Sequence, residues 1–503
     1  MPIHRPLIVS TLIASVLILG GLAPMSGAET VRLKPIPIRT RLSGEIVRLA
    51  HGEGMAVAGF HEDIFVNRAV PGIYAGLGGY GAASGERGGF FIVGGSLGWC
   101  IPLWRRLGLD VGGFAGGGGG TRDTGQGDGL MLRGHAVSTW DFGPVALRVG
   151  IAHTDFPGGT IRSTGLTAGF TLSEFFTVIG HDSDYFSSPP AAPATTQRWS
   201  IAPLVYRYHL DDHTIGREGT PLAREVDIVG IELARHLDGH WRIPVVLGGA
   251  LGGGNRAGYM DVSSGIIYGF GSRWRAEIRA LVGLGGGGSF RTGSGILLRP
   301  ELALGYAPSA DWFFAVRGGR IEAIEGDFTG WVTGVAVHWQ PAQWHVTQPA
   351  QIPASQVRPD SWRVRVGTTA YAVRNVDRPT IHLIDVALEK PLTPFFSLVG
   401  RTRSAYAGDA GSYSEGLFGG RFEHTWTPRW RTGIEVDIGA GGGGGLETGQ
   451  GLIADAMIDV AWRMTAACEV TVGVGRIAAL DGDFSADLFH LGLRWNFSRA
   501  LVR

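Results

Sequence analysis

Residues 489–497, near the end of the chain, read Phe-His-Leu-Gly-Leu-Arg-Trp-Asn-Phe. An apolar or aromatic side chain stands at every second position, with histidine, glycine, arginine and asparagine between them. A period of two is typical of a β-strand whose two faces meet different surroundings. The stretch therefore predicts a strand with one apolar face and one polar face.

The same alternation extends backwards from this strand. It predicts eight strands in the last part of the chain, at residues 362–374, 381–390, 394–405, 411–425, 428–441, 450–462, 465–478 and 483–497. A second set of eight begins near Trp199. Because an even number of antiparallel strands returns the chain to its starting side, each set can close as an up-and-down β-barrel.

A repeated motif divides the chain into three copies with a period of about 160 residues, which is the size of a domain and too long for a solenoid repeat. In each copy a Trp-Arg pair leads to a glycine run, a Thr-Gly-x-Gly segment, an Asp-Phe corner and a last strand. The pairs start at Trp104, Trp274 and Trp430, the glycine runs are 116–120, 285–288 and 441–445, the Thr-Gly-x-Gly segments are 124–127, 292–295 and 448–451, and the corners start at Asp155, Asp327 and Asp483.

The composition excludes several classes of protein. The 503 residues carry 44 Lys+Arg and 44 Asp+Glu, so a basic nucleic-acid-binding face is not expected. The 83 glycines show no Gly-X-Y period, which excludes collagen. Aromatic residues make up 10% of the chain, too many for a disordered protein. What remains is a large, apolar, glycine-rich folded chain.

The N-terminus has the three parts of a secretory signal peptide. His4 and Arg5 give a polar start, an apolar run follows, and the small residues at 26–28 allow cleavage before Glu29. The later chain has no uninterrupted apolar stretch long enough for a transmembrane helix. The sequence therefore predicts an exported protein that would cross a membrane with strands.

The predicted domain boundaries follow from these features and from two Pro/Ala-bearing stretches, whose composition favours extended spacers. Residues 29–68 either supply the first strands of the first copy or stand apart from it. The boundaries are a signal peptide at 1–28, an N-terminal segment at 29–68, the first copy at 69–186, a linker at 187–196, the second copy at 197–339, a linker at 340–361, the third copy at 362–497 and a tail at 498–503.

Two further features favour membrane barrels over a soluble sandwich. Connections between the predicted strands alternate between short and long, as the periplasmic turns and outer loops of outer-membrane barrels do. Tryptophans fall near strand ends, where interfacial girdles lie, at Trp362, Trp426, Trp430, Trp462 and Trp495.

The closing stretch resembles the barrel-assembly signal of bacterial outer-membrane β-barrel proteins. That pattern is a polar residue, a glycine two positions later and two aromatic residues, and here it is matched by His490, Gly492, Trp495 and Phe497. The usual pattern stops at the final aromatic residue, whereas six residues follow Phe497. The resemblance is to the class and identifies no family for the repeat. It implies the outer membrane of a Gram-negative bacterium and the barrel-assembly machinery as a partner during insertion.

The three copies can close in two ways. They can form three small barrels in series, which we favour because eight strands leave an interior that side chains just fill. They can also form one barrel of about 22–24 strands, although the chain has no plug-sized domain and its loops are short. A single large barrel would make a porin-like channel.

Catalytic, cofactor and metal sites are not expected. Gly283 to Gly288 matches GxGxxG, but an alternating strand follows it instead of a phosphate-binding helix. His153, Asp155 and Ser163 offer the groups of a lipid A-modifying hydrolase, but the other copies keep only the aspartate, as expected for a turn residue. The sequence has no HExxH motif, so a metal site is not expected.

The two cysteines, Cys100 and Cys468, are expected to be unpaired. The predicted function is a non-enzymatic outer-membrane barrel with a structural, surface or passive-transport role. Its expected partners are outer-membrane lipids and lipopolysaccharide, without nucleic acid, and the sequence leaves its oligomeric state open.

Overall fold

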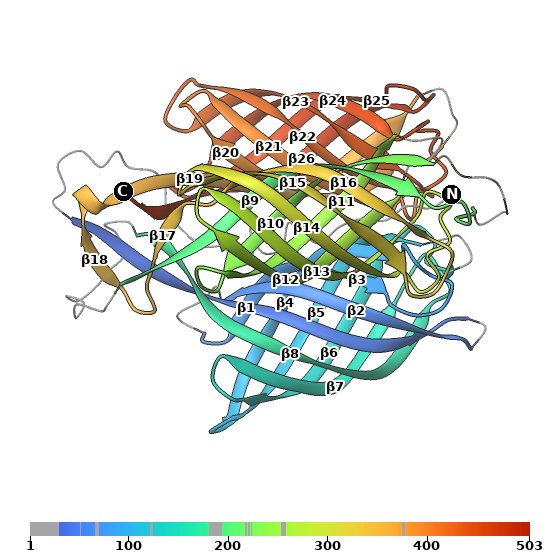
Figure 1. Cartoon of the computed structure of the whole chain (residues 1–503), viewed down its shortest axis with the longest axis horizontal. Helices are drawn as coiled ribbons and strands as arrows, with labels where there is room; N and C mark the ends of the chain where they lie inside the picture. The colour runs from blue at the N-terminus through green and yellow to red at the C-terminus, as the bar shows by residue number, and fades with distance from the viewer. Residues whose placement is uncertain are drawn as a thin grey trace.

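The computed structural model of the chain is an all-β protein built from antiparallel strands (Figure 1). It describes residues 30–50, 52–65, 70–120, 124–180, 194–216, 219, 222, 224–252, 258–374 and 378–503. Within these ranges the 26 strands belong to one hydrogen-bonded system that contains no α-helix. The expected signal peptide and most of the expected linker 187–196 lie outside the described residues. No helix in the described part of the chain is long and apolar enough to cross a membrane.

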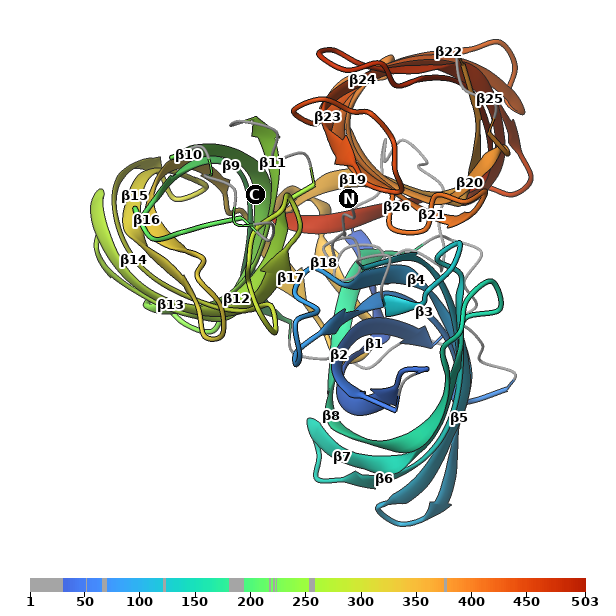
Figure 2. The same cartoon turned by 90° about the vertical axis from the view of Figure 1, so that its right-hand side faces the viewer.

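Hydrogen-bond pairing divides most of the strands into three closed rings of eight (Figure 2). The first strand of each ring pairs with both the second and the eighth: β1 with β2 and β8, β9 with β10 and β16, and β19 with β20 and β26. We call these sets ring 1, ring 2 and ring 3. The ladders between described strands therefore do not form the single ring of 22–24 strands that was the alternative.

The strands are long enough to cross a bilayer when tilted. Ring 1 contains β1 (Thr30–Arg48), β2 (Gly54–Phe65), β3 (Ile73–Ala82), β4 (Phe91–Trp104), β5 (Leu107–Gly119), β6 (Met131–Asp141), β7 (Val145–Asp155) and β8 (Arg162–Ile179). Ring 2 contains β9 (Thr195–Leu210), β10 (Glu225–His236), β11 (Trp241–Gly252), β12 (Met260–Gly271), β13 (Trp274–Gly286), β14 (Ile296–Ser309), β15 (Trp312–Ala323) and β16 (Thr329–Trp339). Ring 3 contains β19 (Val357–Val373), β20 (Ile381–Pro391), β21 (Phe396–Ala407), β22 (Ser414–Thr425), β23 (Trp430–Gly442), β24 (Leu452–Arg463), β25 (Cys468–Ala479) and β26 (Ser485–Val502).

The eight strands expected in the third copy match β19–β26 closely, but both ends of the chain differ from expectation. Residues 29–68 do not stand apart, because β1 and β2 are the first two strands of ring 1. The expected tail, residues 498–503, is strand instead: β26 continues to Val502, which pairs with Val357 of β19.

The expected Pro/Ala-rich linker, residues 340–361, is also folded. It contains β17 (Ala342–His345), β18 (Ala350–Pro353), the short 3-10 helix η3 (Ala354–Gln356) and the first residues of β19. β17 pairs with β9 of ring 2 and touches β26 of ring 3, while β18 pairs with β1 of ring 1. The segment joins ring 2 to ring 3, where a linker was expected, but it also has strand partners in all three rings.

The rings contact one another in a cyclic order near the glycine runs. β5 of ring 1 lies against β21 of ring 3, and β23 of ring 3 lies against β11 of ring 2. The circle closes where Gly81 of β3 approaches Leu284 of β13, and where Gly88 donates a backbone hydrogen bond to Gly293 (2.7 Å). In every pair, the fifth strand of one ring meets the third strand of another.

Glycine permits this close approach. A Cβ atom on Gly117 of β5 would lie 2.8 Å from the backbone oxygens of both Ser404 and Ala405 in ring 3. A Cβ on Gly88 would lie 2.2 Å from Oγ1 of Thr292 in ring 2. These separations are shorter than van der Waals contact, so the glycine runs bring neighbouring barrels together as well as shaping strand ends.

At the opposite end, where the strands are joined by short turns, the rings share an apolar core. It includes Ile38 and Phe176 from ring 1, and Trp362 and Phe497 from ring 3. Trp339 of ring 2 packs against this cluster, and Phe176 meets Phe497 edge to face with ring centroids 5.9 Å apart. The three rings thus contact each other at both ends, through glycine backbone at one and through apolar side chains at the other.

Candidate functional site

The inward faces of the three rings carry most of the buried charge, and they do so in different proportions. Ring 1 has four buried arginines and three carboxylates, ring 2 has four and four, and ring 3 has six and nine. In ring 1 these are Arg39, Arg41, Arg133, Arg148, Glu45, Asp63 and Asp110. In ring 2 they are Arg242, Arg279, Arg299, Arg317, Glu232, Asp261, Glu277 and Glu301. In ring 3 they are Arg363, Arg365, Arg401, Arg403, Arg421, Arg494, Asp385, Glu389, Glu415, Glu423, Glu435, Asp437, Asp455, Asp459 and Glu469.

In ring 1 several arginines share carboxylates. Asp63 accepts from Arg39 (Nη2–Oδ2, 2.9 Å) and pairs with Arg41 (Nη2–Oδ1, 3.3 Å). Asp110 is 3.2 Å from Nη2 of Arg39 and 2.6 Å from Nη1 of Arg148. Because two carboxylates are divided among three arginines, positive charge is in excess on this side of the lumen.

In ring 2 charges of opposite sign are matched. Arg279 binds Glu232 (2.6 Å), Glu277 (3.3 Å) and Glu301 (2.9 Å) at the centre of the lumen. Arg317 also pairs with Glu232, at 2.8 Å. Such a network stabilises only while its partners remain together, because removing one leaves a buried charge uncompensated.

In ring 3 carboxylates outnumber arginines. One arginine, Arg403, contacts three carboxylates: Asp385 (2.9 Å), Glu415 (2.6 Å) and Asp455 (2.7 Å). Asp437 stands directly across the ladder from Asp455, and neither of its carboxylate oxygens accepts a hydrogen bond. Two half-buried arginines at the short-turn mouth, Arg431 and Arg463, each pair with Glu469 and reduce the acidic excess there.

Aromatic side chains close each lumen at the end that carries the longer loops. Ring 2 has the fullest cap, in which Tyr259, Phe290 and Phe328 pack with centroids 4.9–5.4 Å apart. Ring 1 has Phe90 near Phe156, and ring 3 has Phe484 near Tyr371 and Tyr413. Because the charged layer lies beneath these caps, each lumen is filled along much of its length.

The structure corrects one part of the repeat. The backbone carbonyls of Phe328 and Phe484 each accept a hydrogen bond from the last residue of the preceding strand. In ring 1 the carbonyl that accepts the corresponding bond belongs to Ile161. Phe156 is itself the donor to Ile161. The Asp155-Phe156 pair is therefore not structurally equivalent to the other two corners, because the β7–β8 turn of ring 1 has a different register.

The outward faces of the rings are apolar. Leu166 of ring 1, Leu302 of ring 2 and Val436 of ring 3 are 75%, 65% and 57% exposed, and other large aliphatic side chains follow the same faces. Closed antiparallel rings leave no unpaired edge, so such a surface suits a bilayer. The structure is that of a membrane-spanning β-barrel protein.

The tryptophans add a direction to this arrangement. Of the 15 in the chain, only Trp331 lies near the long-loop end of a ring. Trp104, Trp274 and Trp430 are exposed beside the short turns. The aromatic girdle expected from the sequence is thus concentrated at the short-turn end, the periplasmic end in barrels of this class.

The four residues of the predicted assembly signal all lie on β26. His490 faces the lumen, 3.3 Å from Asp385 and within hydrogen-bond distance of Thr369 (3.2 Å). Gly492 pairs with Gly367 across the closing ladder. Trp495 is half-buried, and Phe497 belongs to the apolar core between the rings. The sequence did not indicate that Phe497 would contact another ring.

The proposed hydrolase residues are not brought together. His153 lies on the outer face, where its Nδ1 is 2.8 Å from Oγ1 of Thr164. Ser163 points inward and accepts a hydrogen bond from the backbone of Arg48 (2.9 Å), while Asp155 pairs with Arg162 (3.1 Å). The histidine and the serine occupy opposite faces of the barrel wall, so they cannot act as base and nucleophile on one substrate.

The remaining sequence candidates also have structural positions. Gly283 to Gly286 belong to β13, and the chain continues into a turn and then β14. Both cysteines are free, and Cys100 accepts a hydrogen bond from Nη1 of Arg39 (2.5 Å). No group of three metal-binding side chains occurs among the residues that the structure describes.

Comparisons with known proteins give likeness to solved structures alone. No protein-family model and no curated protein matches the chain. The ferric enterobactin receptor PfeA of Pseudomonas aeruginosa is 11% identical over 92% of this chain and 80% of its own, with a TM-score of 0.28. The outer membrane protein OpdK of the same bacterium is 9% identical over 93% and 98%, with a TM-score of 0.23. Such low TM-scores carry no information about how the strands are arranged.

Proposed function

We propose that the protein is a non-enzymatic, structural outer-membrane protein whose three rings are separate eight-stranded barrels, each closed to solutes. The observation that supports this most strongly is the filling of the lumens: buried ion pairs in the middle and aromatic caps at one end. Eight strands enclose little more than the volume of such side chains. A channel, in contrast, needs a continuous water-filled path.

The distinction between three barrels and one porin-like channel can be tested by conductance. The full chain, refolded into planar bilayers, should give no large, steady current steps in potassium chloride. Steps of the size produced by 16-stranded porins would contradict closed lumens. Incorporation should be verified independently by protease protection of the same bilayers or vesicles, so that a silent bilayer reports a closed barrel and not an absent one.

The non-enzymatic part of the proposal rests on the separation of His153 and Ser163. Expression of the full chain in a Gram-negative host should leave the acylation pattern of lipid A unchanged in mass spectra. A missing acyl chain that reappears with Ser163→Ala would contradict it. Lipopolysaccharide remains the expected neighbour of the long-loop end in this proposal.

We also propose that the last strand is recognised during assembly through His490, Gly492, Trp495 and Phe497, as in the class that it resembles. Because Phe497 also packs between rings, its replacement alone is ambiguous. Deletion of residues 498–503 is the better test: insertion should persist if recognition centres on Phe497. Loss of outer-membrane insertion would instead show that the strand must extend to Val502, which pairs with Val357.

A further inference from the structure

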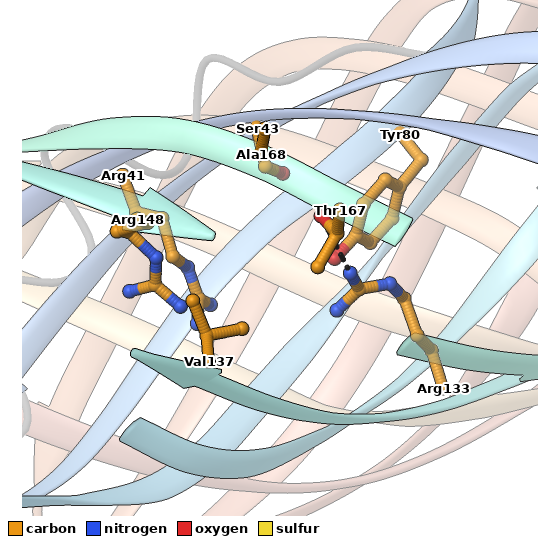
Figure 3. Close-up of a pocket in the computed structure, with 8 residues that line it drawn as sticks. All are labelled: Arg41, Ser43, Tyr80, Arg133, Val137, Arg148, Thr167 and Ala168. Atoms are coloured by element: carbon orange, nitrogen blue, oxygen red, sulfur yellow. Dashed lines mark hydrogen bonds between the residues drawn. The ribbon is translucent and has the colours of Figure 1, made fainter. Parts of the chain in front are cut away.

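The lumen of ring 1 contains a small cavity whose lining is dominated by positive charge (Figure 3). Arg41 reaches it from β1, Arg133 from β6 and Arg148 from β7, and the hydroxyl-bearing residues Ser43 and Thr167 line it as well. The centre of a water-sized sphere can move through about 10 Å³ there. This is close to the room needed for one water molecule, so the cavity accepts one particle of about that size.

The charge balance around the cavity is incomplete. Four inward arginines face three carboxylates, a difference of one positive charge among the buried residues of the inward face. Lys34 and Glu62 are also buried on strands of ring 1, but they have opposite signs and alternate with the inward positions. The guanidinium group of Arg133 donates hydrogen bonds of 2.6–3.1 Å to the carboxylate of Glu45. Arg41 shares Asp63 with Arg39, and its buried Nε has no hydrogen-bond partner.

The two inward histidines, His135 and His61, do not change the net charge around the cavity. Nη1 of Arg133 lies 3.3 Å from Nδ1 of His135. Arginine can only donate, so Nδ1 must hold a lone pair and the imidazole is not doubly protonated. His61 has no hydrogen-bond partner and packs between the rings of Tyr80 and Phe114, at 4.9 and 5.3 Å. Neutral histidines leave the arginines as the source of net charge.

We propose that ring 1 binds one halide ion in this cavity, between Arg41, Arg133 and Arg148. An isolated excess charge in a barrel lumen is costly unless an opposite charge accompanies it. A halide provides that charge as a single atom. The unpartnered Nε–H of Arg41 and the hydroxyl of Ser43 provide donors for it, and chloride is the abundant ion of this kind.

The other rings do not offer the same site. Ring 2 has equal numbers of buried arginines and carboxylates, and ring 3 has more carboxylates. Arg133 lies seven residues before Trp140 on β6 of ring 1, and the residue seven positions before Trp462 on β24 of ring 3 is Asp455. An anion would therefore be repelled from the equivalent place in ring 3. This site does not depend on whether the lumens conduct solutes.

Direct observation of bromide is the first test. Crystals of the full chain grown in sodium bromide should show an anomalous difference peak between the three arginine side chains. The same crystals in sodium chloride provide the control. A water-filled cavity without such a peak at high bromide concentration would overturn the proposal, and a peak at other sites only would mean an adventitious ion only.

Thermal unfolding in detergent is the second test. At constant ionic strength, replacing potassium gluconate with potassium chloride should raise the unfolding midpoint, and the effect should saturate with chloride concentration as binding requires. A linear response without saturation would indicate a general salt effect and overturn the proposal. Sulfate, which is too large for the cavity, should not reproduce the shift.

Variants separate the site from the fold. Arg41→Met should abolish the saturable chloride response, whereas Asp437→Asn in ring 3 should retain it. If Arg41→Met does not fold, Ser43→Ala keeps every charge and should raise the half-saturating chloride concentration by about 2- to 10-fold, the effect of one lost hydrogen bond. An unchanged chloride response in both variants would contradict the assignment.

Discussion

The lumens of ring 1 and ring 3 are both filled by buried charged side chains, but the excess charge is positive in ring 1 and negative in ring 3. Both surround a layer of buried arginines and carboxylates, but ring 1 has one more arginine than carboxylates, and ring 3 has nine carboxylates for six arginines. In ring 1, Asp63 forms ion pairs with two arginines. In ring 3, Arg403 forms ion pairs with three carboxylates. The comparison shows that the scarce charge in each lumen should matter more than the abundant one.

The largest effects should follow from removing the scarce charge. Asp63→Asn in ring 1 and Arg403→Met in ring 3 should each lower the free energy of unfolding by about 3–5 kcal/mol, because several opposite charges lose their shared partner. The measurement is urea unfolding of the full chain in lipid vesicles, followed by tryptophan fluorescence. A loss below about 1 kcal/mol in either variant would show that the scarce charge of that lumen is not essential to its stability.

A smaller effect is expected where ring 1 meets ring 3. Gly117→Val would place side-chain atoms against the backbone of β21 and should destabilise the chain by about 1–3 kcal/mol through overpacking. Gly134→Ala, on the outer face of ring 1 with no atom within 4 Å of its added Cβ, is the matched control. Equal effects of both substitutions would mean that the rings do not press together at Gly117.

Removing the abundant charge should have less effect still. In chloride-free buffer, Arg41→Met and Asp437→Asn should each change the free energy of unfolding by less than about 1 kcal/mol, because each removes a poorly compensated buried charge. The same unfolding assay decides, and a loss comparable to that of Asp63→Asn would show that Arg41 is as necessary as its partner.

At their rims the two rings should behave alike. Arg374 pairs with Asp487 in ring 3, and Arg162 pairs with Asp155 in ring 1, with each arginine well exposed. Arg374→Ala and Arg162→Ala should each cost about 0.2–1 kcal/mol, and the effect should shrink in high salt. A difference of more than about 1 kcal/mol between them would extend the asymmetry of the lumens to the surface.

The sequence predicted the strands well because alternation and turn residues are local signals. The strand bounds of the third copy differ from expectation by a few residues at most places, and the apolar side chains of Phe489, Leu491 and Leu493 are exposed as the alternation predicts. The strand pairing of residues 340–361 was not predicted, because proline and alanine favour extended chain in solution, whereas here β17 and β18 pair with strands of the rings. Partners so distant in sequence leave no local pattern.

The lumen networks were only partly predictable. Arg299 and Glu301 are two residues apart on one strand, so a period of two puts them on the same face, and they contact each other at 3.0 Å. It could not indicate that Arg133 would bind Glu45, 88 residues away, since that depends on how the strands are staggered around the ring. The excess charge of ring 1 becomes visible only when the inward residues of all eight strands are counted together.

The cyclic contact of third and fifth strands has a further consequence. In a homotrimer of small barrels, one gene product must serve in all three places, so any change in a lumen is made three times. Here the three places are covalently joined, and each can diverge while the packing between neighbours is kept. The chain thus packs its three rings as a trimer would, while the sequence of each ring can change independently. One lumen can therefore be basic while its neighbour is acidic.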